Sequence, residues 1–149
     1  SEGRLSSESK LKIRAMLREV TEIESIGDSC YNLARTINHK YRGNEDFTEK
    51  QYSHIHQMFQ LTDDALNQMV SLVEDEGHQV DVNKSFNLEN EINNYRSQLK
   101  NQNVLDVNNK EYDYQMGVHY MDIIGECEKL GDYVVNVVEA SSNVKEKKS

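Results

Sequence analysis

The chain contains no proline and no tryptophan, and only seven of its 149 residues are glycine. Because proline is the residue that most strongly interrupts helices, the long segments rich in Glu, Lys, Gln, Leu and Asn are free to be helical. A chain of this length buries roughly two thirds of the surface that its unfolded form exposes, so it needs no disulfide or metal in order to fold. These features predict a single all-α domain over residues 1–149, with flexible ends at 1–7 and 143–149.

Basic residues are scarce, because 17 Lys and Arg stand against 26 Asp and Glu, which gives a net charge of -9. Nucleic acids and anionic lipids bind through clustered Lys and Arg, so the composition argues against a nucleic-acid partner. No apolar run approaches the roughly 20 residues that cross a bilayer, and no signal-like segment opens the chain. Since the chain lacks an initiator Met, we expect it to be a domain of a longer protein.

Only two cysteines occur, Cys30 and Cys127, and they lie far apart in the sequence. Both fall on the apolar helix faces described below, which indicates buried, reduced thiols and a reducing compartment such as the cytoplasm. Neither cysteine has a histidine placed as a base, and the chain contains neither a Glu-x-x-His nor a Gly-x-Ser-x-Gly motif. We therefore predict that the protein is not an enzyme.

Apolar residues recur along the chain at alternating steps of three and four, which is the spacing of one face of a helix. The pattern predicts four helical segments, at about 7–41, 47–75, 87–101 and 110–141. The last two are separated by a soft stretch at 103–109. We expect an antiparallel bundle of three long helical arms, the third of them broken, so that three to four helices are counted.

One pattern occurs twice in the chain. Residues 22–32 read EIESIGDSCYN and residues 126–136 read ECEKLGDYVVN, so Glu-x-Glu-x-(Ile/Leu)-Gly-Asp-x-x-x-Asn is repeated after 104 residues. The same shift superimposes the apolar seam of the first helix, which consists of Ile13, Met16, Val20, Ile23, Gly27, Cys30, Ala34, Ile37 and Tyr41. Its counterpart in the last helix consists of Gly117, Tyr120, Ile124, Cys127, Gly131, Val134 and Val138. We predict that both seams are buried and that their glycines allow close helix contacts.

The repeated motif carries two acidic pairs, each spaced so that both carboxylates share one helix face: Glu24 with Asp28, and Glu128 with Asp132. Like charges at this spacing repel by roughly 0.2–0.5 kcal/mol, so their recurrence favours a bound cation. Carboxylates on facing helices suit hard ions such as magnesium, calcium, manganese or iron, whereas zinc more often brings His or Cys. The alternatives are solvated acidic faces, or faces that bind Lys or Arg of a protein partner.

The two motif helices resemble the Glu-x-x-x-Asp signature helices of the PhoU family, helical-bundle proteins of bacterial phosphate homeostasis whose typical wording is close to LERIGDxxxNIA. The segment LENEINNYRSQL at 88–99 resembles the middle helix of a PhoU-like unit. Residues 112–140 are similar to the C-terminal cytoplasmic PhoU-like domain that is fused to bacterial sodium/phosphate cotransporters. The resemblance covers nearly the whole chain.

The resemblance implies a regulatory cytoplasmic domain that controls phosphate transport and is held at the inner face of the membrane by a phosphate transporter, in cis or in trans. It also implies a metal site, for iron, manganese, magnesium, calcium or zinc, at Glu24, Asp28, Glu128 and Asp132. Ser25 and Lys129 stand where the family motif usually carries Arg, and the chain has the length of about one bundle where a full-length PhoU has two. A homo-oligomer, and an acidic interaction bundle without metal, are left open as alternatives.

Overall fold

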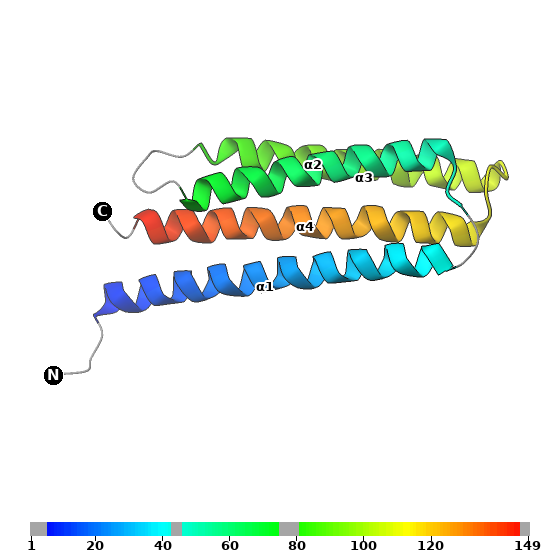
Figure 1. The fold of residues 1–149 in the computed structure, drawn as a ribbon. Helices are drawn as coiled ribbons and strands as arrows, with labels where there is room; N and C mark the ends of the chain where they lie inside the picture. The colour runs from blue at the N-terminus through cyan, green and yellow to red at the C-terminus, as the bar shows by residue number, and fades with distance from the viewer. Residues whose placement is uncertain (1–5, 43–45, 75–80, 147–149) are drawn as a thin grey trace.

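The structure, a computed structural model, describes the backbone of residues 6–42, 46–74 and 81–146 and, apart from 38–42 and 143–146, their side chains. Over these ranges it contains four helices and no strand (Figure 1), so the predicted all-α fold is confirmed. The helices are α1 (Ser7–Arg42), α2 (Glu49–Glu74), α3 (Asn83–Asn108) and α4 (Tyr114–Glu146). Of the ends expected to be flexible, Ser7 belongs to α1 and residues 143–146 belong to α4, whereas 1–5 and 147–149 lie outside the described residues.

The break between the last two helices lies later in the chain than the sequence pattern predicts. Helix α3 continues through the stretch that we expected to be soft and ends at Asn108, two residues before Lys110, whose φ is 60°. Side chains in this turn are held by tertiary contacts, since Asn103 accepts a hydrogen bond of 2.6 Å from the hydroxyl of Tyr112. Helix α4 then begins after Asp113, whose carboxylate accepts a hydrogen bond from the backbone N–H of Met116 at 2.8 Å.

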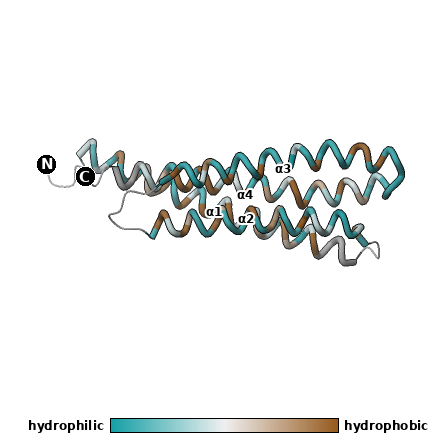
Figure 2. Tube along the Cα trace, turned by 90° about the horizontal axis from the view of Figure 1, so that it is seen from above, coloured by the Kyte–Doolittle hydropathy of each residue, from teal (hydrophilic) through white to brown (hydrophobic). Residues whose placement is uncertain are grey.

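Helix α4 occupies the centre of the bundle. It contacts the other three helices, α2 and α3 contact each other, and α1 packs on α4 alone among the described elements. Figure 1 shows α1 running antiparallel to α4 along the side that faces away from α2 and α3. In Figure 2, apolar segments recur at intervals along the helices, including the lone outer helix α1. No helix in the described ranges is long and apolar enough to cross a membrane.

The predicted seam of α4 is buried, as the sequence pattern indicates. Its large members are at most 2% exposed, and they pack in the core formed with α2 and α3: Tyr120, Ile124, Cys127, Val134 and Val138. Gly131 is buried as well, and a Cβ added to it would lie 3.3 Å from the side chain of Ile92 on α3. The close approach expected at this glycine is confirmed.

The predicted burial of the α1 seam is wrong. Ile13, Met16, Val20 and Ile23 are 42–53% exposed, Cys30 is exposed, and a Cβ on Gly27 would meet no atom within 4 Å. Helix α1 instead turns another face towards α4, which carries the buried or half-buried residues Ala15, Glu22, Ile26, Ser29 and Leu33. A single neighbouring helix can cover only one face of α1, and the covered face is the one whose polar side chains bond to α4.

Candidate functional site

The two copies of the repeated motif pack against each other where α1 crosses α4. The hydroxyl of Ser29 donates a hydrogen bond of 2.7 Å to the carboxylate of Glu126. Two to three turns further along, the side-chain amide of Asn136 donates to the carboxylate of Glu22 at 3.2 Å. Arg18 and Glu139 then form an ion pair with an N–O distance of 3.2 Å. The repeat therefore builds a helix contact, and the first Glu of each copy makes the polar bonds across it.

Glu22 and Glu126 form hydrogen bonds across the α1–α4 contact, and the sequence analysis does not single them out. The signal was present, because each begins a copy of the motif and the two coincide under the 104-residue shift. The candidate site residues are acidic pairs at i,i+4 spacing, and neither Glu22 nor Glu126 has an acidic residue four positions later in the motif. Their half-buried position between α1 and α4 depends on how the helices face each other.

The first acidic pair lies on the exposed side of α1. Glu24 and Asp28 are both exposed. Asp28 lies at a cleft of about 100 Å³ between α1 and α4, which is lined by Ser25, Asp28, Ser29, Asn32, Glu126, Lys129 and Tyr133. Within this cleft the ammonium of Lys129 lies 3.5 Å from the carboxylate of Glu126, so the neighbouring acid is already paired with a cation.

The second acidic pair, on α4, faces α3. Glu128 forms an ion pair with Arg96 of α3, with an N–O distance of 3.4 Å. Asp132, one turn later, lies beside Glu89 of α3 within reach of a side-chain hydrogen bond. Helix α3 also contributes Asn93, whose side chain bonds to Glu89. The α3–α4 face therefore brings three carboxylates, an amide and a guanidinium to one stretch of the bundle.

The pKa of Glu89 is raised above its ordinary value of 4.5. Partial burial is the largest cause, followed by the hydrogen bond and the negative charge of Asp132, while the bond from Asn93 acts in the opposite direction. Two carboxyl groups in hydrogen-bond contact are most stable when they share a proton. The same two groups offer oxygen donors of the kind that hard cations prefer, so a cation could take the place of that proton.

The four carboxylates singled out in the sequence do not meet at one point. Glu24 and Asp28 lie on α1, whereas Glu128 and Asp132 face α3, with which α1 makes no contact. In the described part of the chain, no three His, Cys, Asp or Glu side chains are placed to hold one metal ion. The metal site itself stays a prediction. Sequence reasoning also missed Glu89 on α3, which is followed four residues later by Asn93, the same spacing as that of Asp28 and Asn32 in the motif.

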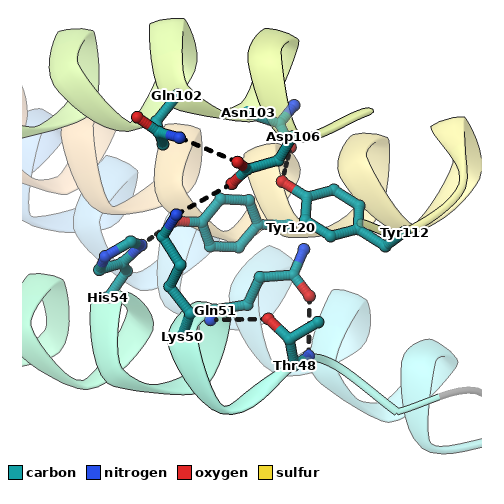
Figure 3. A network of polar contacts seen from close by, with 9 residues as sticks. All are labelled: Thr48, Lys50, Gln51, His54, Gln102, Asn103, Asp106, Tyr112 and Tyr120. Carbon is teal, nitrogen blue, oxygen red and sulfur yellow. Dashed lines mark hydrogen bonds and ion pairs between the residues drawn. The ribbon is translucent and has the colours of Figure 1, made fainter. Parts of the chain in front are cut away.

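A second polar cluster joins the beginning of α2 to α3 and α4 (Figure 3). Nδ1 of His54 and the hydroxyl of Tyr120 share a hydrogen bond of 2.9 Å, and Lys50 lies 3.4 Å from the carboxylate of Asp106. Gln102 also donates to Asp106, at 2.9 Å. Burial and the positive charge of Lys50 lower the pKa of His54, and burial raises the pKa of Tyr120. These groups satisfy one another, so we assign the cluster the role of fixing the three helices relative to each other.

The model of the PhoU domain matches residues 55–141, which is more than half of the chain. The chain belongs to the PhoU domain family. The match begins within α2, includes all of α3 and most of α4, and leaves α1 outside. A search of curated proteins and a search of solved structures each gave no match. The family that the motifs predict is thus confirmed, while the link to a sodium/phosphate cotransporter stays a prediction.

Within the PhoU domain match, the carboxylates of the α3–α4 face all fall inside the matched range, whereas Glu24 and Asp28 fall outside it. The matched range therefore contains Glu89, Glu128 and Asp132, whereas the first motif copy lies on α1, which packs against α4.

Proposed function

We propose that this chain is a regulatory domain that controls phosphate transport, working on the cytoplasmic side of the membrane with a sodium/phosphate cotransporter to which it is fused or bound. The PhoU domain match carries the first part of the proposal, because it indicates a role in regulating phosphate homeostasis. The similarity of residues 112–140 to cotransporter-linked domains supports the choice of partner. The paired polar groups of the bundle support binding rather than catalysis.

The proposal includes a cation bound on the α3–α4 face. Glu89 and Asp132 would supply carboxylate oxygens, and Asn93 would supply an amide oxygen. This donor set suits manganese, iron, magnesium or calcium better than zinc, because it contains no His or Cys. Binding would relieve the repulsion between Glu89 and Asp132, which burial strengthens.

A specific observation favours a second function. The ion pair between Glu128 and Arg96 shows that an acid of the motif already accepts a guanidinium within the chain. The exposed acids of α1, Glu24 and Asp28, could accept Arg or Lys of a protein partner in the same way. In this alternative the acidic faces bind a basic partner and no metal is required.

Thermal melting with and without metal separates the two functions. We expect the melting temperature of the natural chain to be higher with added Mn²⁺, Fe²⁺, Mg²⁺, Ca²⁺ or Zn²⁺ than with chelator. For the ion that fits best, the free energy of unfolding gains about 2.7 kcal/mol at a hundred times the dissociation constant. Asp132→Asn should abolish the rise, because it removes a ligand from the α3–α4 face. Asp28→Asn removes the same charge from α1 and should retain it. If no metal raises the melting temperature of any of the three proteins, the cation site is excluded and the partner-binding function is favoured.

The regulatory function itself is tested by phosphate uptake in the source cells. We expect cells that lack this chain to lose the dependence of uptake on external phosphate concentration, and cells that carry Asp132→Asn to lose part of it. Cells with Glu91→Gln, an exposed acid of α3, provide the matched control. Unchanged uptake in cells without the chain would contradict a role in phosphate transport whatever the metal result.

A further inference from the structure

Glu139 of α4 lies between the contact with α1 and the acidic group on the α3–α4 face. On one side its carboxylate forms the ion pair with Arg18 of α1, with an N–O distance of 3.2 Å. On the other side its negative charge acts on Glu89: after burial and the contact with Asp132, it is a further cause of the raised pKa of Glu89. The same side chain therefore interacts with α1 and with the cation site proposed above.

The antiparallel arrangement of α3 and α4 explains why Glu139 acts on Glu89. Asp132 and Glu139 are seven residues apart, so they lie on the same face of α4 about two turns from each other. Helix α3 runs in the opposite direction to α4 (Figure 1), and its residue Arg96 is level with Glu128. Glu89 precedes Arg96 by about two turns and therefore lies about two turns beyond Glu128. This places Glu89 between Asp132 and Glu139 along the axis of the bundle.

Two features let Glu139 exchange one partner for the other. Side chains on a helix lean toward the N-terminal end of that helix, so on antiparallel helices Glu89 and Glu139 lean toward each other. The side chains of Arg18 and Glu139 are each 45% exposed, and an exposed ion pair of this kind is held weakly. Movement of Glu139 toward Glu89 therefore breaks only a weak contact.

The ion pair between Arg18 and Glu139 attaches the N-terminal half of α1 to α4. Of the polar contacts between these helices described above, it lies nearest to the start of α1. Ala15 is buried in the same half. The larger apolar side chains there are 42–61% exposed: Leu11, Ile13, Met16 and Leu17. Because apolar burial is small in this half, loss of the ion pair weakens its attachment to α4.

We propose that a cation on the α3–α4 face and Arg18 of α1 compete for Glu139, so that binding of the cation loosens the N-terminal half of α1. This regulation rests on the cation site of the proposed function. A divalent ion between Glu89 and Asp132 attracts the carboxylate of Glu139 and repels the guanidinium of Arg18, and both effects weaken the ion pair. The coupling is reciprocal, so Arg18 lowers the affinity of the site for the cation by holding Glu139.

Titration calorimetry with Mn²⁺ measures this coupling. We expect Arg18→Gln to bind Mn²⁺ about two- to fivefold more tightly than the natural chain, which is the range that an exposed ion pair gives. Glu139→Gln should bind Mn²⁺ more weakly, and adding Arg18→Gln to it should have no further effect. Arg14→Gln is the matched control, because it removes the same charge from an exposed position one turn earlier on α1. Its affinity should equal that of the natural chain.

The same titrations separate failure of the cation site from failure of the competition. If Mn²⁺ binds neither the natural chain nor Arg18→Gln, the cation site and the competition are both overturned. If Mn²⁺ binds, Asp132→Asn abolishes the binding and Arg18→Gln gains no more than Arg14→Gln, the cation site stands and the competition is overturned. A gain from Arg18→Gln that persists in the Glu139→Gln background would also overturn the competition.

Limited digestion with trypsin tests the effect on α1. Trypsin cleaves after Lys and Arg, so cleavage after Lys12, Arg14 and Arg18 reports how often the N-terminal half of α1 leaves α4. We expect this cleavage to be about two- to fivefold faster with saturating Mn²⁺ than with chelator, and to be unaffected by Mn²⁺ in Glu139→Gln. Cleavage after Lys100 of α3 is the internal control and should not accelerate. Equal cleavage of α1 with Mn²⁺ and with chelator would overturn the proposal.

Discussion

Glu128 and Asp132 lie one turn apart on α4, yet they face different side chains of α3. Arg96 neutralises Glu128, whereas Glu89 faces Asp132 and adds a second negative charge. Since a positive neighbour favours the charged form of a carboxyl and a negative neighbour disfavours it, the two positions of one motif have opposite electrostatic environments. Electrostatic repulsion therefore favours binding of a proton or a cation between Glu89 and Asp132, and does not favour it at Glu128.

Glu89→Gln should raise the melting temperature at pH 7 in the absence of metal, by about 1–3 °C for a chain of this length. The folded protein raises the pKa of Glu89 above 4.5, so stability is lost as the pH rises from 4.5 through that raised pKa. Glutamine avoids this loss and can donate a hydrogen bond to Asp132. Melting from pH 4.5 to pH 8 should therefore show a difference that shrinks towards low pH.

The control for this prediction is Glu91→Gln, which removes the same charge from an exposed position of α3. Its melting temperature should follow that of the natural chain over the whole pH range. If Glu91→Gln stabilises the protein as much as Glu89→Gln does, the gain comes from the net charge of the molecule, and the contact between Glu89 and Asp132 has no special role.

Single residues also show where prediction from the sequence ends. The spacing of Glu128 and Asp132 predicts that both lie on one face of the helix, and the repeated motif identifies both as candidate site residues. Glu89 lies on another helix and shares no sequence spacing with Asp132, so only the packing of α3 on α4 brings the two together. Contacts across helices depend on the rotation of each helix, which the period of apolar residues describes only in part.

At the scale of the helix, α1 and α4 carry the same pattern but differ in the number of their neighbours. Helix α4 has three, so its seam and its opposite face are both covered, while α1 has one. The sequence predicts the length and period of α1 well because these depend on local propensity. It could not predict which face α1 buries, because Ser29 and Glu22 bond to α4 and the α1 seam therefore lies on the exposed side.

The two motif glycines should respond in opposite ways to the same substitution. Gly131→Leu forces a side chain against Ile92 and should cost about 1–3 kcal/mol in the free energy of unfolding. A Cβ at Gly27 meets no atom within 4 Å, so Gly27→Leu should gain about 0.5–1 kcal/mol from helix propensity. Urea unfolding, at concentrations at which the chain is monomeric, measures both values.

A loss of stability at both glycines would contradict this prediction, since it would mean that the face around Gly27 is covered within one chain. A gain at both would mean that α3 yields at Ile92. Alanine at the same two positions gives an intermediate test, because a Cβ alone fits freely at Gly27 and lies 3.3 Å from the side chain of Ile92 at Gly131.

For the whole molecule, the absence of proline and the regular apolar period were enough to predict an all-helical bundle. The family match covers α3, most of α4 and the greater part of α2, and α1 packs on α4 alone among the described elements. Helix formation was predictable because it is decided locally, whereas the packing of α1 depends on which of its faces bonds to α4.

Attachment along one side has a consequence for how α1 opens and closes. Separating α1 from α4 breaks one helix contact, while α2, α3 and α4 keep all of theirs, so the molecule has a low-energy opening that involves α1 alone. We expect the backbone amides of α1 to exchange with deuterium faster than those of α4.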